Sequence, residues 1–255
     1  MGRIIALANQ KGGVGKTTSA VNLAAGLGIL GKKTLLVDLD PQGSATSSVG
    51  VSKKAQRFTI ADLLIGGCRS DNAVIHTEFQ NLDLIPANIT LAATEFDLIE
   101  KEDAEARLRR ILSTLRDDYD FIVLDCPPSL GMLTINAMVA CDNVIIPMQC
   151  EYFALEGLVQ LMTTIGQLKR RYNPRLVILG ILVTMYNGRL ALSRDVLAEL
   201  QKHYPDRVFH AKISRNARLS EAPGFGMPVY YHDDCSQGAK EYLRATKELL
   251  ERICC

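Results

Sequence analysis

The segment Asn9–Thr18, NQKGGVGKTT, decides the fold, because it joins a short apolar run, RIIALA, to a long run with helical periodicity. It nearly matches the phosphate-binding pattern G-x-x-x-x-G-K-[ST]. Gln10 stands where that pattern has its first glycine, and Lys11 is a second lysine that the pattern does not require. The departure raises the question of whether the extra lysine has a function of its own.

The order of strand, glycine loop and helix predicts phosphate binding. Glycines in the loop allow the backbone to approach a ligand closely, and their amides together with the helix N-terminus favour an anion. Lys16 is predicted to reach the β- and γ-phosphates, and the Thr17 hydroxyl is predicted to bind Mg²⁺. The predicted nucleotide-binding residues are Lys11, Gly12, Gly13, Val14, Gly15, Lys16, Thr17 and Thr18.

Two further apolar runs end in aspartates. TLLVDLDPQGS carries Asp38 and Asp40, and YDFIVLDCPPS carries Asp125. Side chains at the carboxyl ends of buried parallel strands project into the ligand crevice. We therefore predict that Asp125 faces Mg²⁺, directly or through water. Asp38 and Asp40 are two residues apart, which predicts that they share a face of one strand and bracket the metal and the attacking water.

Short β-branched runs alternate with helical stretches along the chain, which predicts an α/β fold with a doubly wound, mostly parallel sheet and helices on both faces. The predicted strands are Arg3–Ala8, Thr34–Val37, Leu82–Ile85, Phe121–Leu124, Asn143–Met148 and Leu176–Thr184. The predicted helices are Lys16–Leu30, Asp103–Arg116, Leu130–Ala140, Glu156–Tyr172, Arg194–His203 and Gln237–Ile253. Pro41–Gln56 and Asn187–Pro228 are the least regular parts, and no linker divides residues 1–255, so a single domain is expected.

The composition is that of an ordinary globular protein, with 47% hydrophobic and 22% charged residues in a chain of 255. The N-terminus lacks the architecture of a signal peptide, and no apolar run reaches the roughly 18 residues of a membrane span. The seven cysteines include no C-x-x-C pair, which favours reduced, mostly buried thiols in a cytosolic protein.

Charge is uneven although the net charge is only +1. Residues 169–218 carry 11 Lys and Arg residues against three acidic residues, a local balance of +8. Such a block suits a phosphodiester backbone, and a set of solvated helix faces explains the charge equally well. No zinc-finger spacing or RNA-recognition motif accompanies it.

The motifs together resemble a known family. KGGVGKTT resembles the deviant Walker A motif of the ParA/MinD class of P-loop ATPases, VDLDPQGSAT its switch-type motif, and FIVLDCPPSLG its Walker B motif. NAMVACDNVIIPMQCEYFALEGL and SRNARLSEAPGFGMPV are similar to phrases of the chromosomal ParA proteins, often called Soj. The resemblance covers nearly the whole chain.

This resemblance implies an ATPase that uses ATP and Mg²⁺ and forms a homodimer on ATP binding. Lys11 would reach the nucleotide of the partner subunit, and Gly12 would lie at the dimer contact. Asp40 would position the attacking water, so the implied catalytic residues are Lys11, Lys16 and Asp40, while Thr17, Asp38 and Asp125 would support Mg²⁺. The family also tolerates a residue other than glycine at the position of Gln10.

The resemblance also implies partners and a location. Arg189 and Arg218 match positions of nonspecific contacts to double-stranded DNA, and a ParB-like protein would activate hydrolysis. The protein would be cytoplasmic and nucleoid-associated, without stable membrane association. Adenine would bind between the end of the strand Ile178–Tyr186 and the loop Ile213–Asn216, where Ser214 replaces a frequent proline.

Four alternatives share parts of the pattern. A MinD-like membrane-cycling ATPase would need a cationic C-terminal anchor, whereas the last helix mixes acidic and basic residues around an apolar stripe. An iron–sulfur reductase would need a second, suitably placed cysteine to act with Cys126, and residues 69–125 contain none. A bacterial tyrosine kinase would need a C-terminal tyrosine cluster, whereas Tyr242 is the only tyrosine after Tyr231. A scaffold that binds nucleotide without hydrolysis is disfavoured by Asp40.

Overall fold

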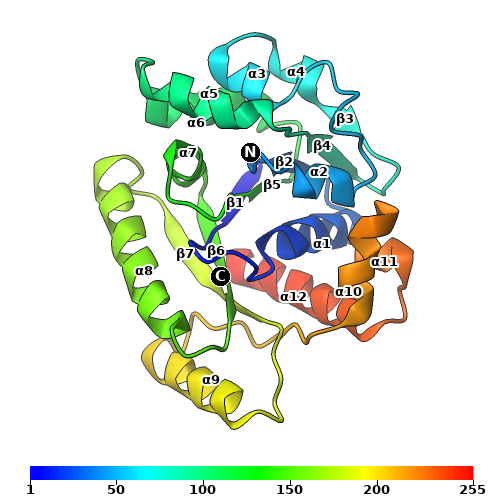
Figure 1. Cartoon of the computed structure of the whole chain (residues 1–255), viewed down its shortest axis with the longest axis vertical. Helices are drawn as coiled ribbons and strands as arrows, with labels where there is room; N and C mark the ends of the chain where they lie inside the picture. Colours follow the sequence, from blue (N-terminus) through cyan, green and yellow to red (C-terminus); the bar gives the residue numbers. More distant parts are fainter. Residues whose placement is uncertain (255) are drawn as a thin grey trace.

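The computed structural model describes residues 1–254 and contains a seven-stranded sheet of order β3-β4-β2-β5-β1-β6-β7 (Figure 1). Its strands are β1 (Arg3–Leu7), β2 (Thr34–Asp38), β3 (Ile75–His76), β4 (Leu82–Ile85), β5 (Phe121–Asp125), β6 (Asn143–Gln149) and β7 (Val177–Thr184). Neighbouring strands are parallel except β3 and β4, which are antiparallel. The predicted doubly wound α/β fold is confirmed.

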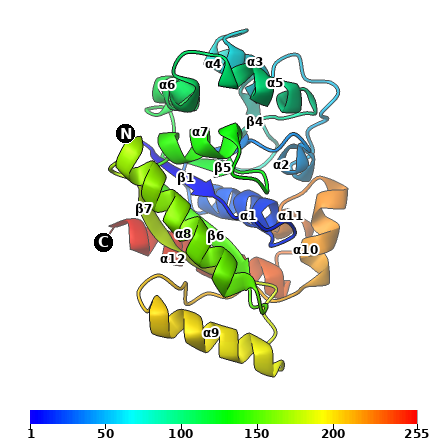
Figure 2. The same ribbon diagram turned by 60° about the vertical axis from the view of Figure 1, so that its left-hand side comes forward.

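Helices connect the strands and cover both faces of the sheet. They are α1 (Lys16–Ile29), α2 (Ser44–Ser48), α3 (Ile60–Ile65), α4 (Ser70–Ala73), α5 (Thr90–Ile99), η1 (Ala104–Ala106), α6 (Arg107–Leu115), α7 (Met132–Ala140), α8 (Ala154–Arg171), α9 (Ala191–His203), α10 (Ala217–Glu221), η2 (Ala222–Phe225), α11 (Val229–His232) and α12 (Gln237–Cys254). Figure 2 shows α8 lying along the β6–β7 side of the sheet, with α9 beyond it.

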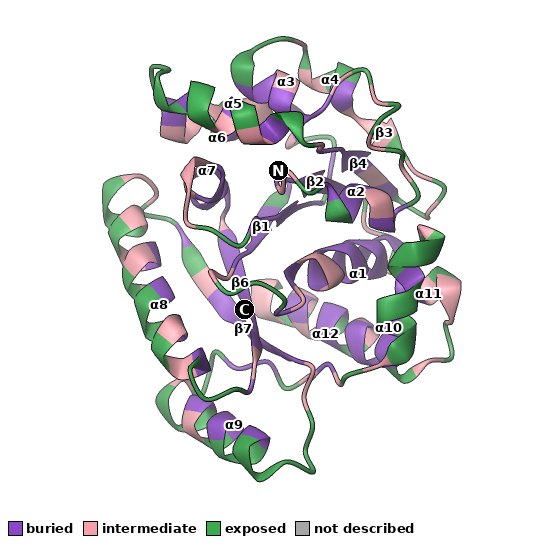
Figure 3. Cartoon of the chain, viewed as in Figure 1, coloured by how far each residue is buried: buried purple, intermediate pink, exposed green. Residues whose placement is uncertain are grey.

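Alternate residues of the strands bury two separate apolar clusters. Ile4 and Ala6 of β1 face the cluster formed with α3 and with α5 to α9, whereas Ile5 and Leu7 face the cluster formed with α1 and α12. The strands and α1 are accordingly among the most deeply buried parts of the chain (Figure 3). Because both faces are covered, the strands are apolar almost continuously.

The structure corrects the predicted elements in three places. The helix expected at Asp103–Arg116 begins as the 3-10 turn η1, because Asp103 has a left-handed backbone with φ of 53°, and α6 ends at Leu115. The irregular stretch Pro41–Gln56 contains the short helix α2. The two-residue strand β3 and the helices α3, α4, α10 and α11 are not predicted, since each is too short to show a clear periodicity. The ten-residue helix α5 is not predicted either.

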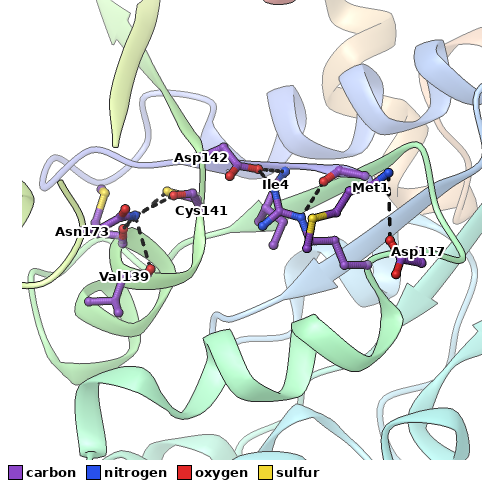
Figure 4. Close-up of polar contacts among 10 residues, drawn as sticks. Met1, Ile4, Asp117, Val139, Cys141, Asp142 and Asn173 are labelled. Atoms are coloured by element: carbon purple, nitrogen blue, oxygen red, sulfur yellow. Dashed lines mark hydrogen bonds and ion pairs between the residues drawn. The ribbon is translucent and has the colours of Figure 1, made fainter. Parts of the chain in front are cut away.

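Polar contacts fix the edge of the sheet where the parallel strands begin (Figure 4). The Ile4 amide donates to Asp142 Oδ2 at 2.9 Å, and Arg116 forms an ion pair with the same carboxylate. Asn173 Nδ2 donates to the carbonyls of Val139 and Cys141 at 3.2 and 2.7 Å, which satisfies the end of α7. These bonds anchor the start of β1 and leave its carboxyl end to present the glycine loop.

The last helix, α12, packs into the protein. Tyr242, Ala245 and Leu249 are buried in the cluster that includes α1. The approach is close at Gly26 of α1, where an added Cβ would lie 2.5 Å from Thr246 Oγ1. The expected core-facing stripe is therefore confirmed, and this helix does not offer its apolar face to a membrane.

Candidate active site

Three strands bring the predicted site residues to one edge of the sheet. In the register of β2 and β5, Asp38 lies directly opposite Asp125, and Asp125 also lies opposite Leu7 at the end of β1. The glycine loop follows Leu7 and leads into α1 at Lys16. The sheet thus places the loop beside two aspartates that are far apart in the sequence.

The loop has the backbone expected of an anion cradle. Gly13 and Gly15 have φ of 72° and 80°, values at which a Cβ is strained, so glycine is needed at both positions. Gly15 caps the N-terminus of α1, which has neither a side-chain cap nor an acidic residue in its first turn. The helix terminus is therefore free to stabilise an anion.

Lys16 lies inside this cradle. Its side chain is buried, with the residue 7% exposed, and its Nζ donates to the Lys11 carbonyl at 2.9 Å. Burial lowers the pKa of Lys16, and the nearby charges of Asp125, Cys126 and Asp40 oppose that shift. A phosphate group next to the ammonium would favour its charged form.

Lys11, the extra lysine, lies elsewhere. Its ammonium forms an ion pair with Glu151, and the two side chains are 47% and 50% exposed. The Lys11 amide is tied back to Asn9 Oδ1 at 3.0 Å. Glu151 was not among the predicted site residues, because it lies 140 residues further along the chain and belongs to no phosphate-loop pattern. Thus Lys16 occupies the cradle and Lys11 extends over the surface.

The structure contradicts the prediction that Asp38 and Asp40 share a face of one strand. β2 ends at Asp38, whose buried Oδ2 accepts hydrogen bonds from the Thr46 amide and hydroxyl at 2.8 and 2.7 Å. Asp40 lies in the following turn, where its Oδ1 accepts from the Gln42 amide at 2.9 Å. Burial raises the pKa of Asp38 to about 6, although the bonds from Thr46 oppose the shift. Asp38 therefore anchors α2, and Asp40 is the more accessible carboxylate.

Asp125 is the unsatisfied group of the site. Both carboxylate oxygens are buried, and neither has a hydrogen-bond partner within ordinary geometry. Burial and the charge of Asp38 raise its pKa well above the usual range, while Thr17 and Lys16 lower it. A buried carboxylate left without partners fits a cation, and Thr17 supplies a neighbouring oxygen. Among residues 1–254 no group of three metal-binding side chains gathers, so Mg²⁺ here would rely largely on phosphate and water oxygens.

The unsatisfied Asp125 predicts a dependence of stability on pH in protein without Mg²⁺. The pKa values of Asp38 and Asp125 are raised on folding, so the folded state retains protons that the unfolded chain has released. Stability therefore falls as pH rises from about 4 through 6, the window set by Asp38, and Asp125 extends the fall to higher pH. We expect Asp125→Asn, which cannot ionise, to raise the melting temperature at about pH 8 by roughly 2–4 °C for each ~1 kcal/mol gained.

Dye-monitored melting with and without MgADP measures both parts of this prediction. Without Mg²⁺ the Asn variant should melt at a higher temperature than the wild type at about pH 8. With MgADP it should lose most of the stabilisation that the wild type gains from the Mg²⁺-bound nucleotide. Asp118→Asn is the matched control, because Asp118 is exposed and lies outside the site. A lower melting temperature of the Mg²⁺-free Asn variant at about pH 8 would contradict the assignment of Asp125 as an uncompensated charge.

A cavity of about 430 Å³ adjoins the loop. The end of β7 contributes Thr184 and Met185, and Ser214 and Asn216 come from the segment expected to contact adenine. Gly15 of the loop forms part of the same wall. The structure thus brings the two segments predicted for the base together, directly beside the phosphate cradle.

The two predicted DNA-contact residues lie in different surroundings. Arg189 is exposed in the segment between β7 and α9. Arg218, in the first turn of α10, forms ion pairs with Glu221 and Asp233 at 2.8 and 3.2 Å. The positive charge of Arg218 is therefore partly neutralised within the chain, whereas Arg189 presents its charge to solvent.

Comparison with known proteins agrees with this geometry. A family model described as an AAA domain matches residues 2–178. The sporulation initiation inhibitor protein Soj of Bacillus subtilis is 48% identical over 249 residues, covering 98% of each chain. The chromosome partitioning protein ParA of Caulobacter vibrioides is 44% identical, covering 98% of this chain and 94% of the relative.

A solved structure with bound nucleotide and metal supports ATP and Mg²⁺ as the ligands of this site. A Mycobacterium smegmatis protein named cobyrinic acid a,c-diamide synthase, with bound ADP and magnesium, has a TM-score of 0.87 and 37% identity, covering 100% of this chain and 96% of that one. Within residues 1–254, no helix combines the length and apolar character that crossing a bilayer requires.

The protein is an ATPase that uses ATP and Mg²⁺. With fold, motifs and relatives in agreement over nearly its full length, the chain belongs to the ParA/Soj family of P-loop ATPases.

Proposed function

We propose that this ATPase forms a dimer when it binds ATP and that the dimer binds double-stranded DNA without sequence preference. The protein would act in chromosome or plasmid segregation, and its whole chain would form a single ATPase domain. The observation that carries the proposal is that Lys16 and Lys11 lie in different places, one buried and one exposed. Lys16 fills the phosphate cradle of its own chain, whereas the Lys11 ammonium lies at the surface, where a second molecule can meet it.

Within one chain, the amides of the loop and Lys16 would hold the β- and γ-phosphates. The residues proposed to hold Mg²⁺ are Thr17 and Asp125, with Asp38 acting mainly by fixing α2 through Thr46. Asp40, which is partly exposed after β2, would orient the attacking water. Mg²⁺ would neutralise charge on the phosphates, as in other phosphate-loop enzymes.

Between chains, Lys11 would act as an arginine finger does. An ammonium supplied by a partner neutralises charge that develops on the transferred phosphoryl group, so hydrolysis requires the dimer. To reach a second subunit, Lys11 must first leave Glu151, and this exposed ion pair is of a kind worth only about 0–1 kcal/mol. The ion pair therefore orders the Lys11 side chain but costs little to break when a second subunit binds.

DNA binding is proposed for the surface around Arg189, at the start of α9. This surface belongs to the basic block of residues 169–218, and Arg189 is exposed there. Contacts to phosphates through such residues are sequence-independent and weaken as salt is raised. Binding to DNA would place the protein on the nucleoid in the cytoplasm, and a ParB-like protein would stimulate hydrolysis.

A reversal of charge at Arg189 tests the DNA surface. We expect Arg189→Glu to weaken ATP-dependent binding to random-sequence duplex about tenfold or more, and to lower the slope of log affinity against log salt by about one. Adding Arg218→Glu to Arg189→Glu should weaken DNA binding by less than a second full phosphate contact would, because Arg218 is already paired with Glu221.

The control for this experiment is Lys101→Glu, since Lys101 is exposed and follows α5 closely in the chain. Figure 1 shows α5 and α9 at opposite ends of the molecule. All variants should keep their basal ATP turnover. Unchanged DNA affinity in the double variant would show that the basic block is only a solvated surface.

The whole proposal is tested by ATP turnover with DNA, with a ParB-like protein and with both. Turnover should be slow alone and rise when both partners are present. Co-sedimentation with anionic liposomes tests the MinD-like alternative, which requires ATP-dependent membrane binding. The apolar stripe of α12 is buried, which argues against that helix as a membrane anchor. Failure of ATP to promote either dimerisation or DNA binding would overturn the proposal.

A further inference from the structure

Two side chains that are not among the predicted site residues hold the carbonyls of the glycine loop. Gln149 Nε2 donates to the Gly13 carbonyl at 2.7 Å, and the buried Thr184 Oγ1 donates to the Val14 carbonyl at 2.8 Å. Gln149 ends β6 and Thr184 ends β7, and they are register partners in the parallel pair. Adjacent strands therefore present two donors, side by side, to two consecutive peptide units of the loop.

This contact fixes more than the two carbonyls. In a trans peptide the C=O of one residue and the N–H of the next lie in one plane and point in opposite directions. The chain has no cis peptide bond among its described residues. With the Gly13 carbonyl turned toward β6, the Val14 N–H must point to the other side, and the Val14 carbonyl in turn sets the direction of the Gly15 N–H.

The loop alone does not determine these directions. Gly13 and Gly15 flank the two peptides, and glycine populates several backbone regions at similar energy, so a peptide flip is inexpensive there. An N–H that points away from the cradle cannot donate to phosphate, and a flipped carbonyl would repel it. The hydrogen bonds from Gln149 and Thr184 remove that alternative before nucleotide arrives.

We propose that Gln149 and Thr184 are positioning residues, which hold the loop in its anion-binding orientation and so raise affinity for the phosphates of the nucleotide. The proposal rests on the loop being the phosphate site, as proposed above. Preorganisation of this kind improves binding because the ordering is complete in the free protein. A merely structural tie between loop and sheet would instead affect folding stability and leave the affinity for both ligands unchanged.

The test compares two ligands in three Thr184 variants of the full chain by calorimetric titration. Thr184 also contributes to the cavity beside the loop, so magnesium pyrophosphate, which has no base, is used together with MgADP. We expect Thr184→Val, which keeps the shape but loses the donor, to weaken the binding of both ligands about tenfold. Thr184→Ser, which keeps the hydroxyl, should bind both ligands within about threefold of the wild-type affinity, and Thr184→Ala should resemble Thr184→Val.

Gln149 provides an independent variant should Thr184→Val fail to fold. Gln149→Glu replaces the donor with an acceptor opposite the Gly13 carbonyl, so it should weaken both ligands more than Gln149→Leu does. Amide resonances of Val14 and Gly15 should shift in the ligand-free variants. A loss confined to MgADP, or equal affinities in Val, Ser and wild type, would overturn the proposal. If Lys16→Ala also left pyrophosphate binding intact, the loop itself would not be the phosphate site.

Discussion

Replacing Lys16 with alanine is expected to weaken MgATP binding by roughly 100-fold or more, which removes it at ordinary concentrations. The ammonium is buried in the cradle and donates to the Lys11 carbonyl, and burial lowers its pKa, so holding this charge there without a phosphate has a cost. A triphosphate offsets that cost through a charge-assisted hydrogen bond. The alanine variant loses this contact.

Lys53→Ala is the matched control, because Lys53 also donates its ammonium to a backbone carbonyl, that of Gln42, but outside the glycine loop. Fluorescent nucleotide titration should give wild-type affinity for this control. Folding of both variants is checked by circular dichroism. Near-normal MgATP affinity in Lys16→Ala would mean that the loop does not hold the phosphates.

Lys11→Ala and Gly12→Val are expected to leave ATP binding nearly unchanged and to prevent the ATP-dependent dimer. A Cβ added to Gly12 meets nothing within 4 Å in its own chain, and Gly12 is not among the residues with positive φ, so a single chain accommodates valine. Any clash must then come from a partner. Loss of the ammonium in Lys11→Ala should lower single-turnover hydrolysis on the order of 10³-fold, as for arginine fingers.

Size-exclusion chromatography with light scattering, with and without ATP, measures the dimer. Gly166→Val is the control, because a Cβ at Gly166 also meets nothing within 4 Å, but this glycine lies in α8 and far along the chain from the loop. A normal ATP-dependent dimer in Lys11→Ala would remove the function proposed for the extra lysine.

Much of this site is readable from local sequence, because its central residues follow apolar strands. Lys16, Thr17 and Asp125 lie where strand ends and the helix start predict them. The relation of Asp38 to Asp40 was predicted wrongly, since alternation along a strand cannot show that β2 stops at Asp38 and that Thr46 takes its carboxylate. A helix as short as α2 has too few residues to reveal itself by periodicity.

The residues that orient the loop could not be found by local patterns. Gln149, Glu151 and Thr184 contact the loop across sequence separations of 136, 140 and 170 residues. Their geometry depends on the order of strands in the sheet, in which β6 lies between β1 and β7. A sequence predicts that such strands exist more readily than it predicts which side chains face one another across them.

The end of β7 connects the glycine loop to the proposed DNA surface. Thr184 holds the loop, Met185 contributes to the neighbouring cavity with a left-handed backbone of φ 50°, and the chain then enters the exposed turn that bears Arg189. Such a backbone is strained for methionine, so the contacts around it must hold it in place. The residue that holds the loop and the proposed DNA contact thus lie on one short covalent segment, and the Tyr186 amide ties the middle of that segment to the Ile213 carbonyl at 2.9 Å.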